Sequence, residues 1–109
     1  PDGDTLPPLE APEPIGVLEV THDGSTCTHR FDGPDVVNPG QSIRMIMVND
    51  GAIDSHTIAW PSEFNGLASI VPAGPGTTRT GYLVATGGRY LLTCASETLG
   101  AELMTIEVE

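Results

Sequence analysis

The chain has 109 residues, with fifteen acidic residues against four arginines and no lysine, and therefore a formal net charge of −11. This length suits one domain with a single core, and the excess of negative charge argues against binding to nucleic acid or to an anionic membrane surface. No apolar run approaches the roughly 18 residues that a membrane-spanning helix requires.

The acidity has two interpretations. It is either a solvated acidic surface suited to high salt, where lysine is avoided, or an acidic docking face that steers a basic redox partner. Steering weakens as salt screens the charges, so the dependence of partner association on ionic strength separates the two.

Residues 1–14, PDGDTLPPLEAPEP, are rich in proline and acidic residues and poor in apolar ones. Such a composition cannot bury enough apolar surface to form a core. It predicts an extended or disordered tether, and the folded domain is expected over residues 15–109.

The rest of the chain is typical of short strands joined by turns. Thirteen glycines and ten prolines favour turns over helices, and apolar residues alternate along several segments as they do in half-buried strands. The predicted strands are 15–21, 27–31, 42–49, 57–60, 77–84, 89–94 and a last strand with Met104, Ile106 and Val108 on one face. Residues 61–75 are predicted to be an irregular crossing, and Trp60, the only tryptophan, is expected in the core. The pattern predicts an all-β fold, a Greek-key antiparallel β-sandwich of seven to eight strands.

Several side chains that bind soft metals are expected at one end of this sandwich. In an up-and-down succession of strands, the 23–26 loop, the loop before His56 and a loop of about eight residues after Cys94 fall at the same end. A short 23–26 loop makes His22 and Cys27 cross-strand neighbours, and Cys27 and His29, two residues apart, point to one face. Met104 follows the loop after Cys94, where the chain turns back into its last strand.

Three segments carry a family resemblance: P-G-Q-S-I at 39–43, N-D-G-x-x-x-x-H-x-I at 49–58 and G-x-Y-x-x-x-C at 88–94. Together they resemble the cupredoxin pattern over about residues 16–109. The segments D-S-H-T-I-A-W-P-S and M-T-I-E-V-E are also similar to the copper-bearing subunit of cytochrome oxidase.

The resemblance implies an extracytoplasmic protein that binds copper and serves in electron transfer or copper carriage. Its partner would be a redox protein or a copper donor or acceptor. His56, Cys94 and Met104 match the family's ligand positions. The loop after Cys94 departs from the pattern because it contains no second histidine; Glu97 and Glu102 stand, without gaps, where the second histidine and the axial methionine are expected. A variant copper site would therefore take a further donor from Cys27 or His29.

Three other interpretations of this end stay open. A Cys27–Cys94 disulfide would leave a metal-free structural or interaction module. A structural zinc or nickel ion is another occupant, and an empty end would leave His56 and Met104 as ordinary core residues. We do not expect an enzyme, because Asp54-Ser55-His56 is too local to form a catalytic triad.

Overall fold

The computed structural model describes residues 13–62, 68–86 and 88–109, and within these ranges the chain forms nine strands and no helix. Accordingly, no helix of the described ranges has the length and hydropathy needed to cross a bilayer. The strands are β1 (Pro14–His22), β2 (Cys27–Asp32), β3 (Val36–Val37), β4 (Ser42–Asn49), β5 (Ser55–Pro61), β6 (Ser69–Ala73), β7 (Thr78–Val84), β8 (Gly88–Ser96) and β9 (Gly100–Val108). The predicted tether falls almost entirely on residues 1–12, which lie outside the described ranges.

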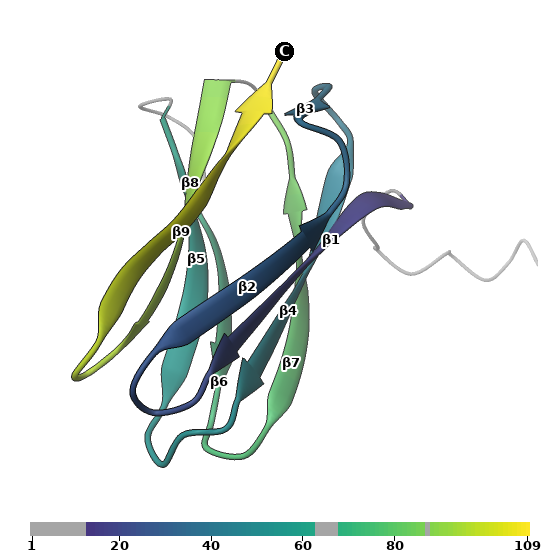
Figure 1. Cartoon of the computed structure of the whole chain (residues 1–109). Coiled ribbons are helices and arrows are strands. Elements are labelled where there is room, and N and C mark those ends of the chain that lie inside the picture. The colour runs from purple at the N-terminus through teal and green to yellow at the C-terminus, as the bar shows by residue number, and fades with distance from the viewer. Residues whose placement is uncertain (1–12, 63–67, 87) are drawn as a thin grey trace, which may run out of the picture.

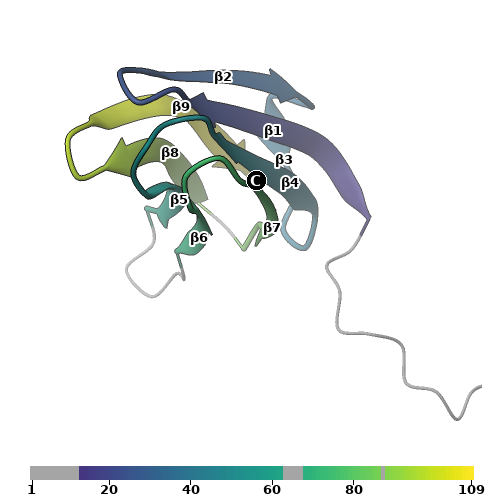
Figure 2. The same cartoon turned by 90° about the horizontal axis from the view of Figure 1, so that it is seen from below.

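The strands form two sheets packed face to face, which confirms the predicted all-β sandwich (Figures 1 and 2). One sheet has the strand order β2-β1-β4-β7 and the other β3-β9-β8-β5-β6. Most neighbours are antiparallel, but β1 runs parallel to β4 and β3 parallel to β9. Parallel neighbours cannot be joined by a tight hairpin, so these two pairings are made by segments distant in sequence.

The core lies between the sheets. It is filled by side chains from alternate residues of each strand, which point inward. In β1, Leu18 and Val20 are fully buried while Glu19 and Thr21 are partly exposed, and in β8 the inward residues are Tyr90, Leu92 and Cys94. Burying a side chain of this size contributes about 1.5–3 kcal/mol. The same alternation therefore decides which residues of each strand can approach the opposite sheet.

Two predicted connections differ from the structure. Residues 69–73 of the expected irregular crossing form β6, an edge strand that pairs only with β5 within the described chain. Pro72 cannot donate to a sheet, but an edge strand tolerates it. After Cys94 the chain stays extended to Ser96, and β9 begins at Gly100, so the expected loop of about eight residues shrinks to the tight turn 97–99. The Ser96 amide donates to the Leu99 carbonyl at 2.7 Å across this turn.

The β1–β2, β4–β5 and β8–β9 connections lie at the same end of the sandwich, as predicted (Figure 1). The expected pairing of His22 with Cys27 is present in the register of β1 and β2. The Asp50 amide donates to the His22 carbonyl at 2.7 Å, and a Cβ on Gly51 would lie only 3.1 Å from the backbone of Gly24. We call this region, with the 23–26, 50–54 and 97–99 turns, the loop end.

Candidate functional site

The two cysteines are bonded to each other just inside the loop end. Cys27 of β2 and Cys94 of β8 form a disulfide with a Cα–Cα separation of 6.4 Å. The bond joins the two sheets, and the Cys94 side chain is 0% exposed. A disulfide sulfur is not a thiolate, which is the form that binds soft metals. In this structure neither cysteine is available as a copper ligand.

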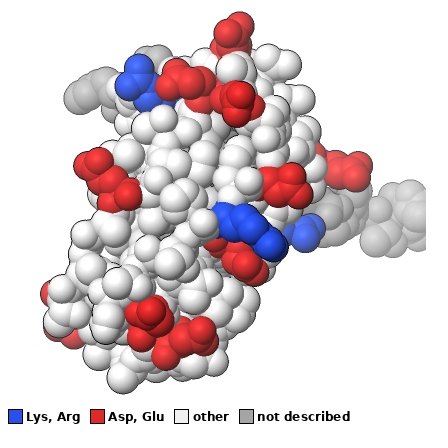
Figure 3. Space-filling model, viewed as in Figure 1, with Lys and Arg blue, Asp and Glu red and all other residues white. Residues whose placement is uncertain are grey.

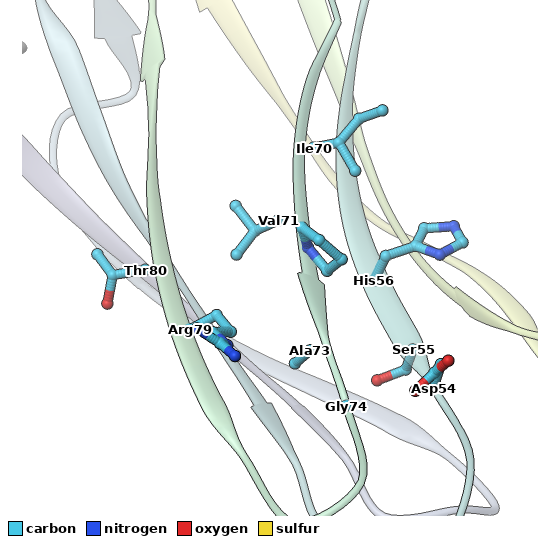
Figure 4. A pocket seen from close by; sticks show the side chains of 10 residues that line it. Asp54, Ser55, His56, Ile70, Val71, Ala73, Gly74, Arg79 and Thr80 are labelled. Atoms are coloured by element: carbon cyan, nitrogen blue, oxygen red, sulfur yellow. The ribbon is translucent and has the colours of Figure 1, made fainter.

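His56 lies on the opposite face of the five-stranded sheet from Cys94. Thr57 is the register partner of Cys94, whereas His56 pairs with Ala95. Because successive side chains alternate in a strand, Thr57 is buried against the core and His56 points outward and is partly exposed. Figure 4 shows the imidazole directed away from the side chains of Val71 and Ala73.

The remaining candidate ligands are also separated. Met104 pairs with Leu92 and packs against the core, and His29 is an exposed residue of the edge strand β2. Throughout the part of the chain that the structure describes, no three His, Cys, Asp or Glu residues are placed to hold a metal ion. The ligand set implied by the resemblance thus does not fit the disulfide-bonded structure, and metal binding stays a prediction for the reduced chain.

His22 is the histidine that the fold brings to the disulfide. It lies beside Cys27 in the register and is fully buried. Its Nδ1 accepts a hydrogen bond from the Gly24 amide at 3.3 Å, and its Nε2 has no partner among the residues that the structure describes. The short 23–26 loop predicted that His22 lies beside Cys27. The burial of His22 depends on the approach of Gly51, whose Cβ position lies 3.1 Å from Nδ1.

The β1–β2 turn holds an acidic side chain by local hydrogen bonds. The amides of Thr26 and Ser25 both donate to Asp23 Oδ1 at 2.8 Å, and the Thr26 hydroxyl lies 3.1 Å from Oδ2. Backbone donation from Thr26, then from Ser25, lowers the pKa of Asp23 from its usual value of 3.8 because these bonds favour the carboxylate.

The outer face of the five-stranded sheet carries an apolar patch, which we call the outer patch. Trp60, expected in the core, is instead 48% exposed, since Ser55, Thr57 and Ala59 take the inward positions of β5. Ile70 of β6 is 58% exposed and pairs with Ile58, and Trp60 donates from Nε1 to Thr93 Oγ1 at 3.0 Å. The register adds Leu91 and Pro72 to the same face. The outer patch is Trp60, Ile70, Pro72 and Leu91, together with Ile58, which is buried at 9% exposure.

Acidic residues border the outer patch. Glu102 is the register partner of Thr93, and Glu107 that of Arg89, so both acids share its face. Arg89 Nε and Glu107 Oε2 are 3.0 Å apart. Figure 3 shows acidic side chains dispersed over the viewed face of the molecule, with arginine in few places. The patch therefore combines an apolar centre with a net acidic surrounding.

Comparison with protein-family models, with curated proteins and with solved structures finds no match to this chain. The fold and its geometry define the class as a two-sheet β-sandwich crosslinked by an intersheet disulfide.

Proposed function

We propose that this chain is an extracytoplasmic, cupredoxin-like domain that works as a metal-free interaction module. It docks a basic protein with an apolar contact surface on the outer patch. The observation that carries the proposal is the exposure of Trp60 beside Ile70 on a β-sheet face. Exposed tryptophan is typical of the centres of protein interfaces, and an exposed apolar patch with a polar rim marks an interaction site.

Charge and redox chemistry support the same function. A chain with a net charge of −11 repels a second copy of itself and attracts a basic partner. Disulfides persist in oxidising compartments, so the Cys27–Cys94 bond favours a periplasmic, secreted or cell-surface location. The bond also fixes the two sheets against each other, which gives the patch a rigid support.

The test compares capture of extracytoplasmic proteins by the wild-type domain and by matched variants. Trp60→Asp and Ile70→Asp change the outer patch, while Tyr82→Asp changes an apolar residue of similar exposure, 40%, on the four-stranded sheet. We expect one basic partner to be retained by wild type and by Tyr82→Asp and lost from both patch variants. The Kd of that purified partner should weaken at least tenfold in Trp60→Asp. Equal capture by all four proteins contradicts the proposal.

Copper binding through Cys94 is the other function that the sequence predicts, and it requires free thiols. Elemental analysis of the purified protein with a thiol count distinguishes the two functions. Two free thiols with one bound copper per chain would favour copper carriage or electron transfer. No free thiol and no stoichiometric metal would favour the interaction module.

A further inference from the structure

The edge strands of the two sheets meet along one side of the sandwich. β6 is the last strand of the five-stranded sheet, β7 is the last strand of the other, and the two are in contact. A Cβ on Gly81 would lie 2.6 Å from Val71 Cγ2, so glycine is what allows this approach. We call the junction the β6–β7 seam.

The seam opens toward the loop end into a cavity of about 470 Å³. A volume of this size is within the range of small-molecule sites. Val71 and Ala73 form part of its wall from β6, Thr80 from β7 and Ser55 from β5. Asp54, His56 and Arg79 also line it, as do Ile70 and Pro72 of the outer patch, so apolar and polar residues contribute to the lining in similar numbers.

Ser55 supplies a buried polar group that has no partner within the described ranges. Its side chain is 2% exposed, and its Oγ makes no hydrogen bond to any residue that the structure describes. A buried hydroxyl without a partner is unfavourable, and such groups in a native structure are explained by strain, function or an unobserved ligand or water. Figure 4 shows the Ser55 hydroxyl directed to the side of Ala73 and Arg79, while the imidazole of His56, which also lines the cavity, points away from Ala73.

Arg79 supplies a cation that is not neutralised within the described chain. It pairs with Met47 in the register, so it projects from the inner face of β7 at the mouth of the cavity. Arg89 has Glu107 as an ion-pair partner and Arg44 lies 5.9 Å from the Tyr82 ring centroid. Arg79 makes neither an ion pair nor a contact with an aromatic ring among the residues that the structure describes.

We propose that this cavity binds a small monocarboxylate that carries an apolar group. The carboxylate accepts hydrogen bonds from the Arg79 guanidinium and the Ser55 hydroxyl, and the apolar group packs against Val71 and Ala73. An arginine fork matches the two oxygens of a carboxylate. Asp54 also lines the cavity, and its negative charge repels a dianion such as a phosphate monoester more strongly than a monocarboxylate.

The same chemistry has two sources, a free acid or the C-terminus of a peptide. N-acetyl-leucine represents the free acid, a tetrapeptide ending in leucine with a free carboxylate represents the peptide, and N-acetyl-leucinamide lacks the charge. Backbone amide NMR shifts of the disulfide-bonded full chain report binding of each. We expect saturable shifts near Ser55, Val71 and Arg79 with the carboxylates and none with the amide. The source is the free acid if N-acetyl-leucine binds more tightly, and the peptide if the tetrapeptide does.

Variants decide whether the named groups hold the ligand. Arg79→Gln should weaken binding at least tenfold and Ser55→Ala several-fold, while Arg89→Gln, a matched control at an exposed arginine, leaves the Kd unchanged. Arg79 is exposed, so its replacement tests the site even if Ser55→Ala fails to fold. Equal binding of the amide, an equal loss in Arg89→Gln, or no saturable binding of either carboxylate overturns the proposal. Ile70 and Pro72 belong to both the cavity and the outer patch, whereas Trp60 belongs only to the patch. Trp60→Asp should therefore leave carboxylate binding intact, which separates binding in the cavity from docking on the patch.

Discussion

At the scale of single residues, one register step between β5 and β8 decides whether Cys94 and His56 lie on the same face of the sheet. Thr57 and not His56 is its partner on β5, so the imidazole and the sulfur belong to opposite faces of a sheet. The sequence placed both residues at strand ends near the same loops. It could not give the pairing register, because that depends on how two segments 38 positions apart in sequence (94 − 56) align.

Loss of the disulfide should be costly. Cys27 and Cys94 are separated by 67 positions, and closing a loop of this length in the unfolded chain stabilises the fold by about 4 kcal/mol in the chain-entropy account. We expect the double variant Cys27→Ala/Cys94→Ala to lose stability of this order in urea unfolding. Wild type with reductant should lose a similar amount, whereas reductant should not affect the variant. A double variant as stable as the oxidised wild type would contradict the crosslink.

Asp23 should make the fold sensitive to acid. Its pKa is lower in the folded chain than the usual 3.8 because the Thr26 and Ser25 amides donate to the carboxylate. A lowered folded-state pKa gives stability that is present above the unfolded-state pKa and is lost as pH falls through the folded-state pKa. The loss therefore begins near pH 4 and continues below it.

The pH dependence of the melting temperature measures this effect. Asp23→Asn should flatten the decline below about pH 4, while Asp35→Asn, at another exposed acid, should leave the shape of the wild-type curve. Identical curves for Asp23→Asn and wild type would show that the hydrogen bonds of this turn do not make the stability of the fold depend on protonation of Asp23.

At the scale of elements, local pattern predicted some strands and missed others for identifiable reasons. The β1–β2 hairpin was predicted because alternation flanks the Asp23-Gly24 turn. β6 was missed because Pro72 and the surrounding glycines are typical of a loop. An edge strand tolerates them, since it needs hydrogen bonds on only one side. The seam could not be predicted, since it joins strands of different sheets through Gly81 and Val71.

A single methyl group added at Gly81 should destabilise the fold at the β6–β7 seam. Val71 is 3% exposed and its branched side chain is short, so it cannot move aside easily. Gly81→Ala would place a Cβ within 2.6 Å of Val71 Cγ2, and overpacking of this kind costs about 1–3 kcal/mol. Urea unfolding of Gly81→Ala measures the loss.

A double-mutant cycle shows whether Val71 is the cause. Val71→Ala removes the methyl groups that clash, so Gly81→Ala should be much less destabilising in that background than in wild type. Additive effects of the two substitutions would mean that the strands do not meet through these residues.

At the scale of the whole molecule, the excess of acidic residues makes the chain repel itself and attract a basic partner. Acidic side chains are dispersed over the face seen in Figure 3, and a net charge of −11 disfavours the compact state through self-repulsion. Composition alone predicted this charge, but the apolar outer patch beside Glu102 and Glu107 appeared only with the fold.

Salt should act on stability and on docking in opposite directions. At an ionic strength near 1 M the Debye length falls to about 3 Å, which screens the repulsion between acids, so the urea midpoint should rise from low to high NaCl concentration. The association rate of a basic partner should fall over the same range, because screening removes the attraction that guides the encounter. A charge-reduced variant, Glu102→Gln/Glu107→Gln, should lower the association rate at low salt and match wild type at high salt. A rate that does not depend on salt, together with a rising midpoint, would assign the acidity to solvation at high salt and not to steering of a partner.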